Sequence, residues 1–310
     1  MPSVELLSAS EWTGTSADPN DVQFGHIVEP TTMERANEYD VVLVGEPYDG
    51  AVLSRPGARR GPAAVRSELA GTKTAHLNAG VVTSVGDLGD IDVPIGLDVV
   101  TAQDGISNIT ETIHQADAFP VFIGGDHSVA VPNVSPLLVG EQSVGVINID
   151  AHADVREPKP SPYNGTPFRQ LIEEGLDAYA FVGARNFETS KPYLEYLNKR
   201  DATVISAGEV GSDPMKAGGK SLNAMEDVDL IYVSCDIDVL DMSASPGSTA
   251  PTPGGLTSRE LYELLWTIAQ NDRIVGFDLV GCAPSLDAEG RSAKAGSRAI
   301  AHFISGLQQR

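Results

Sequence analysis

The chain has 310 residues and a net charge of -22, from 43 acidic and 21 basic residues, and such a surface repels nucleic acid and anionic membranes. No apolar run approaches the ~18 residues of a membrane helix, and the N-terminus lacks the basic start and apolar middle of a signal peptide. We therefore expect a cytoplasmic protein with no nucleic-acid or membrane partner.

The charge also bears on the source of the protein. Few of the basic residues are lysines, and an acidic surface of this kind is typical of proteins that stay soluble at high salt, where screening removes self-repulsion. We predict a halophilic source. An ordinary acidic cytosolic enzyme is the alternative.

The first 38 residues are interrupted by Gly14, Pro19, Gly25 and Pro30, so we expect an extended arm or cap there and regular structure only after it. Beyond this segment, short apolar runs alternate with stretches that have a helical pattern. The chain is short enough for one α/β core, and we predict a single catalytic domain over residues 1–310.

The apolar runs are rich in β-branched residues and apolar on both faces, as in the buried strands of a parallel sheet. The last helical stretch opens with a capping box, Thr257 followed by Glu260. Strands are predicted at 41–45, 119–125, 143–149, 179–184, 202–206, 229–234 and 273–280, and helices at 61–71, 104–118, 191–200 and 257–271. This alternation predicts an α/β fold, a three-layer doubly wound sheet of mainly parallel strands with helices on both faces.

Three of the predicted strands end in polar residues that are able to bind a metal. "GGDHS" contains His127, "DAHAD" contains Asp150, His152 and Asp154, and "SCDIDVLD" contains Asp236 and Asp238. In such a fold, ligands bind at the carboxyl ends of the strands. Because strand side chains alternate between faces, we expect residues two apart in each motif to lie on one side.

Four aspartates in one buried pocket would repel each other strongly unless cations neutralised them. Two divalent ions would do so, and oxygen-rich ligation with two imidazoles favours Mn²⁺ over structural zinc. Each motif also has a simpler explanation, because an aspartate at a strand end often caps the next helix. The three motifs together favour a two-metal site that activates a water for hydrolysis.

Other residues of similar chemistry are not expected to bind the metals. His26, His76, His114 and His302 lie in the arm, in a loop or in helix-like segments. Cys235 and Cys282 cannot form a disulfide framework, and we expect both to be buried free thiols.

Two further aspartates, Asp126 and Asp241, flank the ligand motifs. Metal-bound imidazoles usually need a partner on their second ring nitrogen. We therefore predict that Asp126 and Asp241 orient the groups that bind the metals.

The three motifs, together with "GEPYDG" (45–50) and "RPGARRGPAAVR" (55–66), resemble the ureohydrolase family of arginases, agmatinases and formimidoylglutamases. The resemblance covers most of the chain. It implies an arginase-like α/β sheet, two Mn²⁺ per subunit, hydrolysis of a guanidino or formimino C–N bond, and assembly into homo-trimers or hexamers. The metal ligands that it implies are His127, Asp150, His152, Asp154, Asp236 and Asp238.

The segment after the second motif, "VREPKPSPYNGTPFRQ", bears on the substrate. Arginases and agmatinases usually have a His where this chain has Asn164, and the pattern is most similar to formimidoylglutamases, which release formamide and L-glutamate in histidine breakdown. Their substrate carries two carboxylates, which guanidinium groups bind bidentately. We predict that Asn164, Arg156, Arg169 and Arg185 contact substrate, although a loop-bracing ion pair is the alternative for each arginine.

One position departs from the family pattern. A Glu that contacts the substrate is common after the last strand of the family, but this chain has Gly281 there. Either Asp278 or a backbone carbonyl supplies the contact instead, or the accepted substrate differs from those usual in the family. In the mechanism that we expect, Asp154 passes a proton from the attacking water to the leaving amine.

Three functional hypotheses follow from these observations. The first is hydrolysis of N-formimidoyl-L-glutamate, a small-molecule substrate. The second is an agmatinase or another guanidino-compound hydrolase that releases urea. The third, of a different class, is a non-catalytic oligomer that the metals stabilise.

Overall fold

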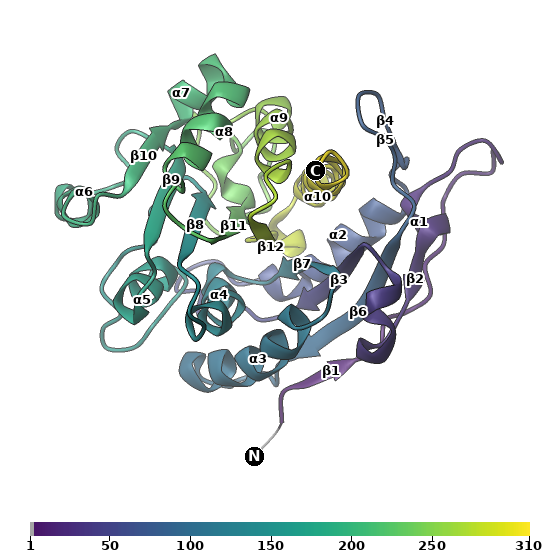
Figure 1. Cartoon of the computed structure of the whole chain (residues 1–310), viewed down its shortest axis with the longest axis horizontal. Helices are drawn as coiled ribbons and strands as arrows, with labels where there is room; N and C mark the ends of the chain where they lie inside the picture. Colours follow the sequence, from purple (N-terminus) through teal and green to yellow (C-terminus); the bar gives the residue numbers. More distant parts are fainter. Residues whose placement is uncertain (1–2) are drawn as a thin grey trace.

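A ten-stranded sheet forms the middle layer of the computed structural model, which describes residues 3–310 (Figure 1). Its strands are β1 (Glu5–Leu7), β2 (Val28–Pro30), β3 (Val41–Glu46), β6 (Val85–Asp92), β7 (Phe119–Gly124), β8 (Val144–Ile149), β9 (Ala178–Ala184), β10 (Thr203–Ser206), β11 (Leu230–Asp236) and β12 (Ile274–Val280). The order is β1-β6-β3-β7-β12-β11-β8-β9-β10, with β2 also paired to β6. Only β1 runs antiparallel to its neighbour among these described strands.

Helices cover both faces of the sheet (Figure 1). The helices are α1 (Phe24–Ile27), α2 (Gly61–Ala70), α3 (Val99–His114), α4 (Ala130–Leu138), α5 (Pro167–Glu174), α6 (Lys191–Asn198), α7 (Ala207–Ser212), α8 (Pro214–Asn223), α9 (Ser258–Ala269) and α10 (Arg291–Leu307). One core cluster packs α2 and α7 to α10 against the sheet, and a second packs α3 to α6 against the opposite face. The predicted three-layer α/β fold is confirmed.

All seven predicted strands are present, because each is an apolar run that can be recognised locally. Every residue of β3 and of β8 is buried, as expected of central parallel strands. The capping box of α9 is also confirmed, since Thr257 accepts from the Glu260 amide and the Glu260 carboxylate accepts from the Thr257 amide.

The prediction that regular structure begins after residue 38 is wrong. Strand β1 pairs antiparallel with β6, and β2 pairs parallel with the same strand. Each has three residues, which is too short for a periodic pattern to be recognised. A single domain over residues 1–310 stays a prediction.

The sequence pattern also missed β6 and α10, and placed one helix inaccurately. Strand β6 contains Asp87, which is buried and paired with Arg66 of α2 at 2.8 Å, so its charge is compensated by a distant residue. Helix α10 is rich in serine and glycine, which have low helix propensity, and is stabilised by its packing. The helix predicted at 104–118 spans Val99–His114, because Asp98 caps its N-terminus by accepting from the Thr101 amide.

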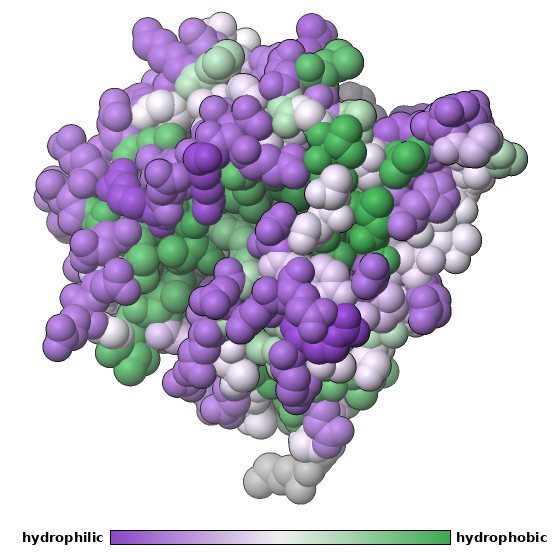
Figure 2. Space-filling model, turned by 45° about the vertical axis from the view of Figure 1, so that its right-hand side comes forward, coloured by the Kyte–Doolittle hydropathy of each residue, from purple (hydrophilic) through white to green (hydrophobic). Residues whose placement is uncertain are grey.

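The surface agrees with the composition. Hydrophilic residues cover most of the face shown in Figure 2. Within residues 3–310, every helix is too short or too polar to span a bilayer.

Glu46 ends β3 in the protein interior, and its carboxyl group is incompletely bonded. The Asn133 side-chain amide donates to one carboxyl oxygen at 3.0 Å, while the other oxygen has no partner. Burial raises the pKa of Glu46 well above its ordinary value, and the nearby charge of Asp278 adds to this effect. The interior therefore favours the protonated form of Glu46.

We predict that Glu46→Gln stabilises the protein increasingly as the pH rises. The folded-state pKa is raised, so the stability that the protonated group contributes is present below pH ~4.5 and is lost as the pH rises through the folded pKa. The variant cannot ionise, and its advantage should grow by about 1.4 kcal/mol per pH unit over this window. Urea unfolding of both proteins from pH 4.5 to 8 measures the difference.

The comparison should be made at saturating Mn²⁺, so that any metal contribution cancels between the two proteins. A stability difference that does not change with pH would contradict the raised pKa of Glu46. The variant Asn133→Ala is a useful control, because removing the amide donor should raise the carboxyl pKa further and extend the loss of stability to higher pH at the same slope.

Candidate active site

The three ligand motifs come together at one edge of the sheet. His127 lies in the 3₁₀ helix η3 (His127–Val129) after β7, and Asp238 lies in η4 (Ile237–Val239) after β11. The segment from Asp150 to Asp154 follows β8 directly. Because β7, β8 and β11 are parallel strands of one sheet, their carboxyl ends bring these segments together.

The backbone at each motif differs from the predicted strand alternation. Asp150 and the residues after it lie beyond the end of β8, and only Asp236 is still within its strand. In each motif, an aspartate carboxylate accepts from the amide two residues on, which turns the chain. The pairs are Asp126 with Ser128 at 2.9 Å, Asp150 with His152 at 2.8 Å, and Asp236 with Asp238 at 2.8 Å.

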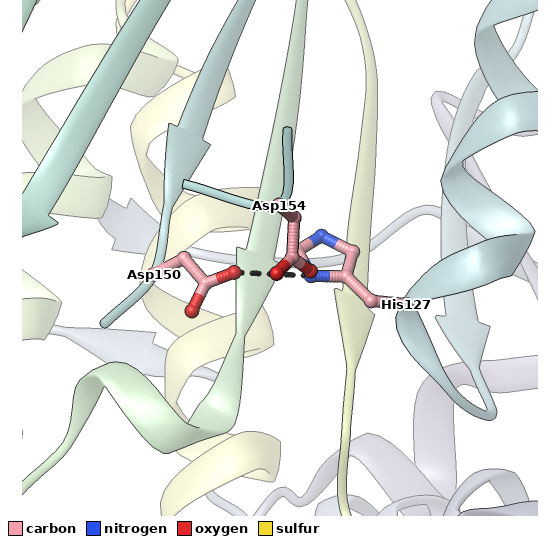
Figure 3. A group of neighbouring side chains, drawn as sticks. All are labelled: His127, Asp150 and Asp154. Carbon is pink, nitrogen blue, oxygen red and sulfur yellow. Dashed lines mark ion pairs between the residues drawn. The ribbon is translucent and has the colours of Figure 1, made fainter. Parts of the chain in front are cut away.

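His127 faces three carboxylates. Its Nδ1 lies 3.1 Å from Asp150 Oδ2, 3.1 Å from Asp154 Oδ2 and 3.6 Å from Asp236 Oδ2. Figure 3 shows the carboxylates of Asp150 and Asp154 directed toward the imidazole of His127. His127, Asp150 and Asp154 form one group whose ligand atoms lie within 4.8 Å of each other.

A second group shares one of these carboxylates. His152 Nδ1 lies 3.4 Å from Asp150 Oδ1 and 3.4 Å from Asp238 Oδ2. The ligand atoms of Asp150, His152 and Asp238 also lie within 4.8 Å of each other. Asp150 thus directs one oxygen to each imidazole, which is the arrangement of a carboxylate that bridges two ions.

Asp154 reaches the site through an unusual backbone conformation. Its φ of 45° is in the left-handed region, which Asp tolerates better than most residues. The Asp154 carbonyl accepts from the Phe168 amide at 3.2 Å, so α5 anchors the turn.

The electrostatics of the cluster require compensating positive charge. Burial raises the pKa of Asp236 well above its ordinary value, and burial with the charge of Asp150 raises the pKa of Asp238 to about 6. For His152, burial lowers the pKa, but the negative charge of Asp238 outweighs it and raises the pKa to about 12. These shifts favour the protonated forms of the three groups, and a bound cation would compensate the same negative charge.

Unpartnered atoms indicate that the cluster fits metal ions. His127 Nδ1, Asp150 Oδ2 and Asp238 Oδ1 are buried and have no hydrogen-bond partner. Buried polar atoms normally have partners, and two of these three, His127 Nδ1 and Asp150 Oδ2, face each other at 3.1 Å within the first group. A donor set of carboxylate oxygens and two imidazole nitrogens suits Mn²⁺.

Asp126 and Asp241, which we predicted to orient the metal-binding groups, do not bond to either imidazole. Asp126 accepts from the amides of Ala51 and Ser128, and Asp241 accepts from Ser243 and Gly254. Both hold loops, which is what short-range Asp hydrogen bonds commonly do.

The second nitrogens of the two imidazoles face residues that the motifs did not reveal. His127 Nε2 lies 3.0 Å from Ser234 Oγ, which donates to Asp278 at 2.5 Å. His152 Nε2 lies 3.7 Å from Glu188, the residue that directly follows "GARNF". Asp278 accepts a hydrogen bond from Ser234 on the far side of His127 from the carboxylates. This position argues against the predicted contact of Asp278 with substrate.

The three predicted substrate-binding arginines lie in different environments. Arg185 is buried and bonds to backbone carbonyl groups. Its guanidinium donates to the carbonyl oxygens of Asp238, Leu240 and Thr252. Its side chain is only 6% exposed. These contacts hold the segment after Asp238 in place, so they favour a structural role over contact with substrate.

Arg169 is paired within the protein, whereas Arg156 is exposed at the site. Arg169 pairs with Glu173 at 2.5 Å and stacks on Tyr196 with its guanidinium carbon 3.8 Å from the ring centre. Arg156 is exposed and lines a small cavity with His152, Asp154 and Glu188.

Asn164 is held close to Arg156 by the backbone. The Arg156 amide donates to the carbonyl of Gly165, the next residue after Asn164, at 3.0 Å, and the Asn164 amide donates to Ala51 at 3.2 Å. The segment that the sequence associates with specificity therefore lies beside the cluster.

Gly281 is required by the shape of the site. Its φ is 81°, and a Cβ at this position would lie 2.3 Å from Asp236 Oδ1. Any side chain here would displace the Asp236 carboxylate.

The remaining histidines and the cysteines agree with expectation. Within the described range 3–310, the two metal-competent groups contain none of His26, His76, His114 and His302. Cys235 and Cys282 are buried free thiols.

Residues 39–306 match the model of the arginase family. The chain belongs to the arginase family. A formimidoylglutamase from Halobacterium salinarum is 48% identical over 305 residues, which cover 97% of this chain and 99% of that protein. The proclavaminate amidinohydrolase of Streptomyces clavuligerus is 35% identical, covering 81% of this chain and 83% of that protein. The resemblance stated from the sequence is confirmed.

Solved structures of the arginase family have the same fold. The formimidoylglutamase from Bacillus subtilis has a TM-score of 0.83 at 27% identity, covering 95% of this chain and 94% of that one. The formiminoglutamase from Trypanosoma cruzi, solved with Mn²⁺, has a TM-score of 0.82 at 26% identity, covering 89% and 96%.

We predict that Arg185→Ala destabilises the protein by about 2 to 4 kcal/mol, because it leaves buried carbonyl groups without donors. The free energy of unfolding in urea measures this effect. Arg156→Ala is the matched control, and its exposed position should keep the change within about 0.5 kcal/mol. An Arg185→Ala protein of unchanged stability would contradict the structural role of Arg185.

Proposed function

We propose that this protein is a two-manganese hydrolase that cleaves the formimino C–N bond of N-formimidoyl-L-glutamate, giving L-glutamate and formamide in histidine degradation. The observation that carries the proposal is the pair of ligand groups sharing Asp150, in a chain 48% identical to a formimidoylglutamase. Cytoplasmic location, a halophilic source and assembly into a homo-trimer or hexamer are part of the proposal.

The six predicted ligands divide between the two ions. Asp150 would bridge them, His127, Asp154 and Asp236 would hold one, and His152 and Asp238 would hold the other. When bound, two Mn²⁺ ions lower the pKa of water and supply a nucleophile at neutral pH. The T. cruzi formiminoglutamase solved with Mn²⁺ supports this choice of metal.

Asp154 is the proposed proton carrier. It lies at the cavity that Arg156 and Glu188 also line, and its side chain is 11% exposed, so it is accessible to substrate. Its carboxylate accepts the proton that the attacking water releases and gives it to the glutamate nitrogen as the C–N bond breaks. Formamide keeps the former formimino carbon, so the atoms of one water are divided between the two products.

The two carboxylates of the substrate need cationic or amide partners. Arg156 is exposed at the cavity, and Asn164 is adjacent to it through Gly165. We assign both to substrate binding. The contacts of Arg169 and Arg185 within the protein favour loop bracing for these two arginines.

A second candidate is hydrolysis of a guanidino acid with release of urea. It is favoured by the proclavaminate amidinohydrolase of S. clavuligerus, which has a TM-score of 0.80 and 31% identity in its solved structure. Such a substrate also carries a carboxylate, so Arg156 would serve it equally well.

The deciding assay gives Mn²⁺-loaded protein N-formimidoyl-L-glutamate, agmatine and 3-guanidinopropionate in separate reactions at high salt. We expect formamide and glutamate in equal amounts from the first compound. Urea from either guanidino compound, without formamide, would favour the second candidate. Tight Mn²⁺ binding without any product would favour the metal-stabilised oligomer.

We predict that Asp154→Asn lowers kcat on N-formimidoyl-L-glutamate by about 10²- to 10⁴-fold, because an amide cannot carry the proton. The thermal midpoint should stay close to that of the unmodified protein. Turnover near the original rate in a fully folded variant would rule out Asp154 as the proton carrier.

We predict that Arg156→Ala raises KM for N-formimidoyl-L-glutamate about tenfold, which corresponds to one lost charge-assisted hydrogen bond. Arg169→Ala is the matched control, since this arginine pairs with Glu173 and should leave KM unchanged. Steady-state kinetics of both variants measure the effect. The reverse pattern, with KM changed only in Arg169→Ala, would assign the substrate contact to Arg169.

A further inference from the structure

A buried chain of hydrogen bonds extends from His127 away from the carboxylate cluster. His127 Nε2 lies 3.0 Å from Ser234 Oγ, and Ser234 Oγ lies 2.5 Å from Asp278 Oδ1. The other oxygen of Asp278 accepts from the Tyr232 hydroxyl at 3.1 Å. All four residues are at most 1% exposed, so water does not compete for these bonds.

The sheet register places these groups together. Ser234 of β11 and Asp278 of β12 are direct partners across the two parallel strands. Strand β12 also pairs with β7, whose end leads to His127. The chain of bonds is therefore built on three adjacent strands and does not depend on a flexible loop.

The number of available protons sets the direction of each bond. Ser234 has one hydroxyl proton, and the 2.5 Å separation from Asp278 is the length of a hydroxyl donating to a carboxylate. Because that proton is committed, Ser234 Oγ can only accept from His127. The proton of a neutral His127 imidazole must then be on Nε2.

The opposite nitrogen is the one that faces the carboxylates. With the proton on Nε2, the Nδ1 lone pair points toward Asp150 and Asp154, where Nδ1 has no hydrogen-bond partner. We infer that Ser234 and Asp278 are positioning residues that hold His127 in the tautomer able to bind a cation through Nδ1. This inference rests on the proposed metal site, and it adds two residues that act through His127.

A nearly isosteric substitution can reverse the direction of the hydrogen bonds between Asp278, Ser234 and His127. In Asp278→Asn, the amide donates to Ser234 Oγ, and the serine hydroxyl then turns its proton toward His127 Nε2. The imidazole proton must move to Nδ1, where it blocks the cation. Ser234→Ala only removes the acceptor, so it should be less harmful than the inversion.

The experiment is a Mn²⁺ titration of the full protein, in which calorimetry and electron paramagnetic resonance measure the affinity of each site. We expect Asp278→Asn to weaken one of the two sites about 100-fold and Ser234→Ala to weaken it about 10-fold. The double variant should bind like Ser234→Ala alone, because no hydroxyl remains to donate to His127. Tyr232→Phe is the control, since it removes a bond to Asp278 without reversing Ser234.

Two outcomes would overturn the inference. The first is unchanged Mn²⁺ affinity in Asp278→Asn. The second is a double variant whose loss is the sum of the two single losses, as expected of unrelated structural damage. If Asp278→Asn does not fold, ¹⁵N spectra of the Zn²⁺-loaded unmodified protein test the inference instead. We expect the imidazole proton of His127 on Nε2. A proton on Nδ1 would contradict the inference.

Failure of the inference is distinguishable from failure of the proposed function. The function predicts two Mn²⁺ sites and formamide release in the unmodified protein, whatever the variants do. The inference about Ser234 and Asp278 predicts the order in which the variants lose Mn²⁺ affinity, and this affinity is measured without substrate.

Discussion

Four aspartates and two histidines meet in the interior of this protein, and the rest of the site is arranged around their mutual repulsion. Burial disfavours every charged carboxylate, and it raises the pKa of Asp236 and Asp238 in particular. Protons or divalent cations must balance this charge. The shared Asp150, with one oxygen toward each imidazole, makes two cations a better match than scattered protons.

The fold meets this constraint with backbone turns, which fix the ligands more firmly than strand alternation would. Asp150 and Asp236 each accept the amide two residues on, so these carboxylates are oriented before any metal binds. Asp126 turns the chain beside His127 in the same way. Gly281 leaves space for Asp236, and Arg185 fixes the carbonyl groups after Asp238. A rigid set of acids loses little conformational entropy when a cation binds.

The sequence is sufficient to predict features that depend on local chemistry. Buried strands such as β8 and the metal-binding residue types could be recognised because each is contained in a few consecutive residues. Strand β6 could not, since Asp87 looks unsuited to a buried strand until Arg66 is placed beside it. The sequence suggested Asp278 only as a substrate contact, and its link to Ser234 behind His127 could not be predicted, because only the register of β11 and β12 joins them.

The arginines show why residue type alone does not assign a role. Arg156, Arg169 and Arg185 are equally able to bind a carboxylate, and all three lie in segments near the site. Their partners distinguish them, since Arg185 is saturated by carbonyl groups and Arg169 by Glu173 and Tyr196. Arg156 remains exposed at the cavity. In a protein of net charge -22, an exposed guanidinium beside the cluster gives the carboxylates of the substrate a favourable point of approach.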